Sequence, residues 1–103
     1  MEYKIKITTP AYEDLDEILT YITQELCAPA AASRFADALE DCYNNLKKNP
    51  LMYPLTDIPE LAERGYRRAP VKNYLVLYEV DETVRFVYIH RIFYGARNYI
   101  DLI

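Results

Sequence analysis

The chain has 103 residues, enough for one domain with a single modest core, and 51% of its residues are hydrophobic. This composition excludes a disordered chain, and no apolar run approaches the roughly 20 residues that would span a bilayer. The net charge is −4, with −7 on residues 1–63 and +3 on residues 64–103. The basic C-terminal part can therefore face an anionic partner. The acidic charge of the whole chain argues against strong sequence-independent binding of nucleic acid.

The beginning of the chain predicts a strand followed by a helix. Residues 2–8 alternate apolar and polar side chains, as in a half-buried strand. Thr9 and Pro10 then supply a helix start, with Thr9 as the cap and Pro10 at the first helical position. The following helix should have about 16 residues, because apolar side chains recur there at helical spacing. These are Ala11, Leu15, Ile18, Leu19, Ile22 and Leu26.

A second helix is predicted from about Pro29 to Lys48, because a proline disfavours helical conformation in the residue before it and Asn49-Pro50 ends the pattern. The short break between the two helices predicts an antiparallel helical hairpin. Cys27 and Cys42 fall among helical residues, and we expect both to be small buried hydrophobic side chains. One His and no Cys-x-x-Cys motif predict no metal site and no cofactor.

The remaining elements are a loop and three strands. Residues 51–65 predict a connection with one helical turn at 59–64, in which Gly65 eases the entry into the sheet. Three antiparallel strands follow, because short polar breaks separate segments rich in β-branched and aromatic residues. They are about Tyr66–Val71, Asn73–Val80 and Val84–Ile92.

The predicted fold class is α+β, with the order β-α-α-β-β-β and a short C-terminal helical turn. The helical hairpin should pack on one face of an antiparallel sheet, and residues 1–103 should form a single domain. The N-terminus opens no signal peptide, so the expected location is the cytoplasm.

Arginine and tyrosine side chains of the C-terminal part are the candidates for function. Adjacent residues of a strand point to opposite faces, so Arg67 and Arg68 cannot both belong to one site, and His90 should oppose Arg91. The best candidate cluster is Arg91, Tyr94, Arg97 and Tyr99. The alternative to a functional role is that these four residues only pack the tail of the chain.

A series of motifs covers nearly the whole chain in a fixed order. They are Thr9-Pro10-Ala11, Asp14-Leu15-x-x-Ile18-x-x-Tyr21-Ile22, Leu46-x-x-Asn49-Pro50, Gly65-Tyr66-Arg67-Arg68, Asn73-Tyr74-Leu75-Val76-Leu77-Tyr78-Glu79-Val80 and the tail from His90 to Leu102. In this order and at these separations they resemble the RelE/ParE superfamily of type II toxin–antitoxin toxins. No single motif is diagnostic, but together they identify the family.

The resemblance implies one of two mechanisms. RelE-like members cleave mRNA in the ribosomal A site, whereas ParE-like members inhibit DNA gyrase by binding. The tail resembles the ParE-type pattern Arg-x-x-His-Gly-x-Arg-Asp-Tyr, with Tyr94 where His is common and Asn98 where Asp is common. The nuclease branch usually has an Arg directly after the first Tyr of its Tyr-x-x-x-Tyr motif. Leu75 occupies that position here, which removes one cation from the nuclease pattern.

RNA cleavage needs a base, an acid and cations that face the phosphorane. Candidate catalytic residues are Arg68, Arg91, Tyr94, Arg97 and Tyr99, with the arginines as cations and the tyrosines as proton donors. Arginine stays protonated and therefore serves poorly as a base. Candidate target-binding residues are Arg67, Arg68, Arg91 and Arg97.

The resemblance therefore implies a cytoplasmic toxin of a plasmid-stabilisation module that inhibits growth by binding DNA gyrase. A cognate antitoxin protein would hold it inactive in a hetero-oligomer, by docking on the helical hairpin or on a sheet edge. The alternatives are a ribosome-dependent mRNA interferase, with ribosome and mRNA as partners, and an inactive toxin-derived module that binds antitoxin. Only the mRNA interferase would be an enzyme, an endoribonuclease, so the question whether the chain is an enzyme stays open.

Overall fold

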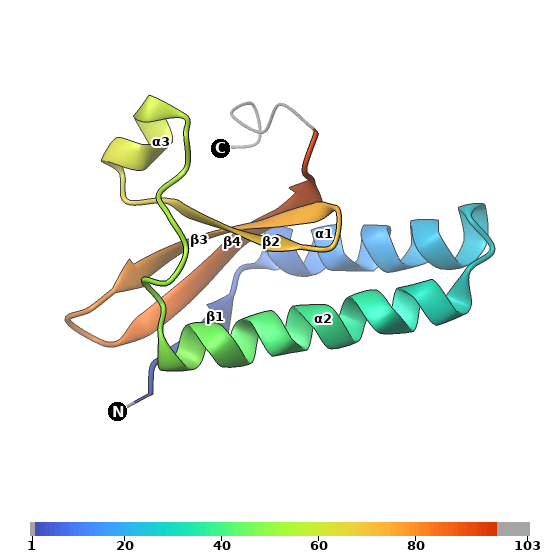
Figure 1. The fold of residues 1–103 in the computed structure, drawn as a ribbon, viewed down its shortest axis with the longest axis horizontal. Coiled ribbons are helices and arrows are strands. Elements are labelled where there is room, and N and C mark those ends of the chain that lie inside the picture. Colours follow the sequence, from blue (N-terminus) through green and yellow to red (C-terminus); the bar gives the residue numbers. More distant parts are fainter. Residues whose placement is uncertain (1, 97–103) are drawn as a thin grey trace.

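A helical hairpin covers one face of a four-stranded sheet in a computed structural model of the chain, which describes residues 2–96 (Figure 1). The elements are β1 (Lys4–Ile7), α1 (Thr9–Thr20), the π-helical segment η1 (Tyr21–Glu25), α2 (Pro29–Lys48), α3 (Pro59–Glu63), β2 (Arg67–Val71), β3 (Tyr74–Asp81) and β4 (Phe86–Tyr94). The short helix α3 lies on the opposite side of the sheet from α1 and α2 (Figure 1). The predicted α+β class and order are confirmed, while the predicted C-terminal helical turn lies outside the described residues.

The sheet has the order β1-β4-β3-β2 and is mixed. β2, β3 and β4 are antiparallel neighbours as predicted, because short turns join them. β1 is parallel to β4, which corrects the prediction of a wholly antiparallel sheet. The helical hairpin lies between β1 and the other strands in sequence, so no tight turn sets the direction of β1.

Helix α1 begins one residue earlier than predicted, because Thr8 and not Thr9 is the cap. The Thr8 hydroxyl accepts a hydrogen bond from the Ala11 N–H at 3.3 Å and donates one to the His90 carbonyl at 3.0 Å. The cap therefore also ties the start of α1 to β4. At its other end the helix widens into η1, a π-helical segment that the helical spacing of apolar residues did not reveal.

Two hydrophobic clusters lie on the two faces of the sheet. The larger one fills the space between the helical hairpin and the sheet, and its largest fully buried side chain is Tyr78. The smaller cluster lies below α3 and consists of Leu61, Tyr66, Leu77 and Phe93, with Ile58 and Leu75 packed against it. Successive side chains of β3 point alternately toward the helical hairpin and toward the α3 side of the sheet, as is typical of a strand.

Strand β4 departs from strict alternation through a bulge. Tyr78 pairs with Ile89 and Leu77 pairs with Arg91, so His90 is an extra residue between the two pairs. Ile89 and Ile92 consequently both belong to the larger cluster although they are three residues apart. The prediction that His90 and Arg91 oppose each other across the sheet relied on unbroken alternation, and the bulge removes that basis.

The two cysteines differ from each other, contrary to the prediction that both are buried. Cys27 is exposed at the hairpin turn, where its backbone has a φ of 49°, and Cys42 is buried at 4% exposure. Burial raises the pKa of the Cys42 thiol from 9.0 to about 11. In the described part of the chain, no helix is long and apolar enough to cross a membrane.

Because the Cys42 thiol is buried, we predict that the free energy of unfolding falls at alkaline pH. Folding favours the neutral thiol, so this contribution to the free energy of unfolding is complete below pH 9 and is lost as the pH rises to about 11. We expect a loss of about 2–3 kcal/mol from this group. Urea unfolding at pH 8 and pH 11 measures the loss. Between these pH values the wild type should lose more stability than Cys42→Ala, by this amount, and equal losses in the two proteins would contradict the prediction.

Candidate functional site

Arg91, one of the candidate catalytic and target-binding residues, is paired with Asp14 of α1. The guanidinium donates from Nε to Oδ2 at 2.7 Å and from Nη2 to Oδ1 at 2.9 Å, a two-pronged contact. The side chains are 22% and 11% exposed, respectively. The hydrogen bonds to Asp14 raise the pKa of Arg91, although burial opposes the shift. A negative partner therefore already holds this cation.

The position of Asp14 follows from the unequal lengths of two neighbouring strands. β1 pairs with β4 only as far as Ile89, and β4 continues to Tyr94. Beyond Ile89 the backbone of β4 has no strand neighbour on that side among the described residues, and α1 packs there instead. The Asp14 carboxylate accepts a hydrogen bond from the Ile92 N–H at 3.0 Å, so it satisfies a donor that a longer β1 would have bonded.

Arg67 and Arg68 point to different surroundings, as their adjacent positions on a strand predict. Arg67 donates from Nη1 to the Tyr53 carbonyl at 2.7 Å and so fastens the segment before β2 to the sheet. Arg68 lies 4.0 Å from the Asp57 carboxylate, with side chains that are 36% and 69% exposed. A pair this long and this exposed holds the Arg68 guanidinium only weakly.

Leu75, where the nuclease pattern has a cation, packs against the apolar cluster below α3. Its partners across the sheet are Pro70 on β2 and Phe93 on β4, and the buried Leu77 and Tyr66 belong to the same cluster. On this face the sheet therefore presents hydrocarbon at the position where the resemblance to a nuclease would require positive charge.

His90 lies beside this cluster and has several close neighbours. Its ring stacks on Tyr66, with centroids 5.0 Å apart and an interplanar angle of 12°. Nε2 lies 2.6 Å from the Glu79 carboxylate, within ion-pair distance. These contacts hold the His90 ring against Tyr66 and beside Glu79.

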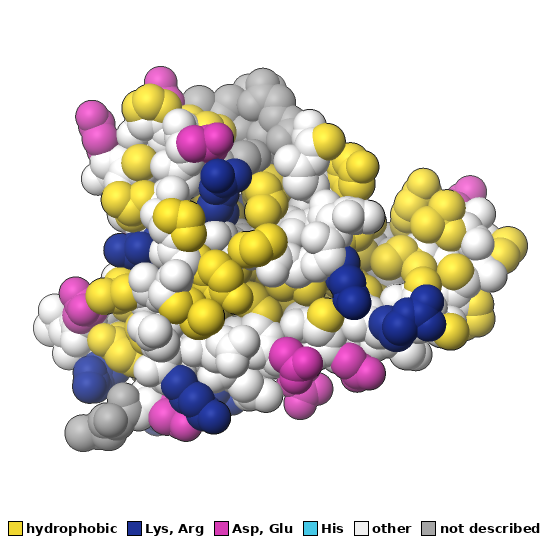
Figure 2. All heavy atoms as spheres, in the orientation of Figure 1, with side chains coloured by type: hydrophobic (Ala, Val, Ile, Leu, Met, Phe, Trp, Pro, Cys, Tyr) yellow, Lys and Arg dark blue, Asp and Glu magenta, His cyan; other side chains and the backbone are white. Residues whose placement is uncertain are grey.

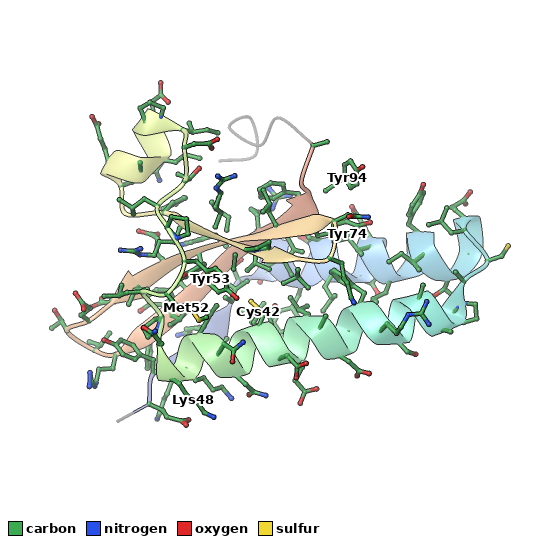
Figure 3. The ribbon with its side chains drawn as sticks, viewed as in Figure 1. Cys42, Lys48, Met52, Tyr53, Tyr74 and Tyr94 are labelled. Atoms are coloured by element: carbon green, nitrogen blue, oxygen red, sulfur yellow. The ribbon has the colours of Figure 1, made fainter. Side chains whose placement is uncertain are left out.

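The predicted cluster of Arg91, Tyr94, Arg97 and Tyr99 is described only in part, because Arg97 and Tyr99 lie outside the described residues. Tyr94 is 54% exposed at the end of β4, and its ring meets Tyr74 edge to face at 5.9 Å (Figure 3). Arg91 and Tyr94 line two adjoining hollows of the surface, which share Asp14 and Glu17.

A hollow beside the helical hairpin was not anticipated as one feature from the sequence. It is a groove of about 650 Å³ where the end of the helical hairpin projects beyond the sheet. Figure 2 shows hydrophobic side chains gathered on this projecting end, with positively charged side chains beside them. Its lining includes Tyr21, Leu26, Arg34, Phe35, Lys72, Tyr74 and Tyr94.

A signal for this groove was present in the sequence but was assigned to the core. Leu26 belongs to the predicted apolar spacing of the first helix, and Tyr21 was noted as a motif residue, yet they are 55% and 49% exposed, because in residues 2–96 no strand lies opposite the end of the hairpin. Among residues 2–96, no group of three or more His, Cys, Asp or Glu side chains is arranged to hold a metal ion.

Comparisons with known proteins agree with this architecture. The profile of the family described as ParE toxin of type II toxin–antitoxin system, parDE, matches residues 5–99. The toxin–antitoxin complex RelBE2 from Mycobacterium tuberculosis contains a similar chain, at 27% identity and a TM-score of 0.65, covering 91% of this chain and 99% of that one. No curated protein gave a significant match.

Two further structures share the fold at lower identity. The chromosomal ParDE system from P. aeruginosa has a TM-score of 0.70 at 20% identity, covering 90% of this chain and 96% of that one. The archaeal RelE–RelB complex from Pyrococcus horikoshii has a TM-score of 0.63 at 17% identity, covering 94% and 99%, respectively.

Proposed function

This chain belongs to the ParE toxin family of type II toxin–antitoxin systems, and we propose that it inhibits DNA gyrase by binding and not by cutting RNA. The single observation that carries the choice is the apolar environment of Leu75. Leu75 lies against a cluster that contains Leu77 and Phe93, on the sheet face opposite the helical hairpin. Stabilising a phosphorane there would require cations, and hydrocarbon cannot supply that charge.

The pairing of Arg91 supports the same choice. A guanidinium that already binds a carboxylate in two places would have to give up Asp14 before it could clamp a phosphate. Arginine also cannot act as the base that RNA cleavage needs. A binding inhibitor has no such requirement, since it needs only a complementary surface.

The proposal includes the setting in which the toxin acts. We propose a cytoplasmic toxin of a single domain, neutralised by an antitoxin in a hetero-oligomer. The similar chain from M. tuberculosis belongs to a toxin–antitoxin complex and the one from Pyrococcus horikoshii to a RelE–RelB complex, which supports a protein partner of this kind. Arg68 is our candidate for contact with gyrase, because its guanidinium is partly exposed and only weakly paired.

A supercoiling assay tests the proposal. We expect the purified chain to abolish DNA supercoiling by gyrase at saturating concentration. Arg68→Glu should raise the half-inhibitory concentration about tenfold, because it replaces an attraction with a repulsion. Lys48→Glu makes the same change of charge at the far end of α2 and should leave that concentration unchanged. Undiminished supercoiling at saturating wild-type protein would refute gyrase inhibition.

A translating extract provides the second measurement. We expect intact mRNA in the presence of the chain. Codon-associated cuts that disappear in Arg91→Ala would identify an mRNA interferase instead. Expression without any growth defect would favour the inactive antitoxin-binding module.

A further inference from the structure

We propose that the loop at residues 50–58, between α2 and α3, is a preformed apolar surface that binds gyrase. The choice of gyrase as the partner rests on the proposed function. Figure 3 shows Met52 and Tyr53 on this loop, above the end of α2, whereas Lys48 points below that end. Figure 2 shows hydrophobic side chains gathered over the same loop and the neighbouring end of the sheet.

The loop exposes three large apolar side chains within five residues. Leu51, Met52 and Leu55 are 46%, 46% and 44% exposed, respectively. Single exposed apolar side chains are common on protein surfaces, but a group of them rimmed by polar residues is typical of a protein-binding site. Asn49 precedes this group in the chain and Asp57 follows it, and both are exposed. The loop therefore has the composition of a contact surface.

Hydrogen bonds hold the backbone of the loop in place. The Pro50 carbonyl accepts from the buried Tyr78 hydroxyl at 2.7 Å. The Tyr53 carbonyl accepts from the Arg67 guanidinium at 2.7 Å. The N–H of the buried Thr56 donates to the carbonyl of the residue just before β2 at 2.9 Å. Because the loop is ordered before a partner arrives, binding costs it little conformational entropy.

The loop adjoins Arg68, the residue that we propose for contact with gyrase. The Arg68 N–H donates to the Pro54 carbonyl at 3.3 Å, and its guanidinium lies 4.0 Å from Asp57 in the last part of the loop. One partner can therefore cover the apolar side chains and reach this cation at the same time. The matching surface of gyrase is apolar and carries a carboxylate at its margin.

Two other occupants fit the loop less well. A strand cannot be added to β2 here, because Leu55 already forms a bridge to Arg67 and Pro70 has no N–H to offer. A partner therefore meets side chains of the loop and not backbone groups. Three half-exposed side chains also fall well short of the roughly 800 Å² per partner that a stable dimer buries, so the loop alone cannot hold a second copy of this chain.

Variants in the supercoiling assay with purified gyrase test the inference. Leu51→Ser combined with Leu55→Ser should raise the half-inhibitory concentration at least about tenfold, because two apolar contacts are lost. Leu26→Ser combined with Val84→Ser removes two side chains that are 55% and 54% exposed elsewhere on the surface and should leave that concentration unchanged. Leu51→Met combined with Leu55→Met keeps the loop apolar and should inhibit as the wild type does.

Direct binding separates a lost contact from a lost fold. In biolayer interferometry on immobilised gyrase, the Leu51→Ser, Leu55→Ser variant should dissociate faster, with little change in its association rate. Urea unfolding of this variant should match the wild type, because both substituted side chains are exposed. Arg68→Glu should instead slow association, and high salt should reduce that effect.

Defined outcomes would overturn the inference. If the Leu51→Ser, Leu55→Ser variant inhibits at the wild-type concentration, the loop is not the contact, although gyrase inhibition stands. Undiminished supercoiling with the wild-type chain would overturn both gyrase inhibition and this assignment of the loop, so the two failures are distinguishable. An equal loss in the Leu26→Ser, Val84→Ser variant would also reject the loop as the specific contact. Sedimentation that finds a wild-type dimer, dissociated by the loop variant, would assign the loop to a second copy.

Discussion

Replacing Asp14 by alanine is expected to lower the free energy of unfolding by about 3–5 kcal/mol. The change removes both hydrogen bonds to Arg91 and the acceptor of the Ile92 N–H, and it takes away the carboxylate that the largely buried guanidinium binds in two places. Domains of this size have a stability of about 5–15 kcal/mol, so the loss is a large fraction of the total. Urea unfolding followed by circular dichroism measures it.

Two further variants show whether the effect comes from the ion pair. Asp16→Ala removes an exposed carboxylate from the same helix and should change stability by less than about 0.5 kcal/mol. Asp14→Asn keeps one oxygen as an acceptor but loses the charge, so its cost should lie between those of the two alanine variants. Similar stabilities of Asp14→Ala and Asp16→Ala would show that the pair does not stabilise the fold.

Tyr78→Ala is the second change with a large expected effect, a loss of about 3–5 kcal/mol. Tyr78 is fully buried in the larger hydrophobic cluster, and its hydroxyl donates to the Pro50 carbonyl at 2.7 Å. The residue therefore joins the centre of the sheet to the end of α2. Thermal or urea unfolding of the purified variant measures the loss, and a cost below about 1 kcal/mol would mean that the site collapses around the smaller side chain.

Tyr78→Phe separates the hydrogen bond from the packing. Phenylalanine fills nearly the same space, so its cost should be about 1–2 kcal/mol and should come from the unpaired Pro50 carbonyl. Burial raises the pKa of the Tyr78 hydroxyl above its ordinary value of 10, so the neutral phenol is the form that folding favours. The difference between wild type and Tyr78→Phe should therefore persist from neutral pH to pH 10 and change only above it.

Local signals in the sequence were sufficient for most of the fold. The second helix runs from Pro29 to Lys48 as predicted, because Pro29 and Asn49-Pro50 act on the backbone of their immediate neighbours. Gly65, expected to ease the chain into the sheet, has a φ of 86°. The direction of β1, the bulge at His90 and the π-helical segment depend on packing between distant elements, which local patterns do not encode.

Local patterns in the sequence predicted less of the candidate site than of the fold. Sequence reasoning found Arg91 but not its partner, because Asp14 is 77 positions away and was noted only as a motif residue. It singled out Leu75, because a missing charge is visible in a motif, and the bearing of Leu75 on the mechanism stays a prediction. The groove was missed because an apolar helical position predicts burial, and whether a strand lies opposite depends on the lengths of both elements. The functional roles of Arg67, Arg68, Arg91, Tyr94, Arg97 and Tyr99 stay predictions.

The parallel pairing of β1 with β4 also has a consequence for synthesis of the chain. Lys4 and Phe86 are register partners, so β1 must wait for β4 to leave the ribosome before it can pair. Pairings between such distant segments form late, because a long loop must close first. A nascent chain therefore cannot complete its sheet until β4 has emerged. Completion of the sheet is thus expected to follow translation of β4, which gives a partner protein a period in which to meet the chain before its fold is complete.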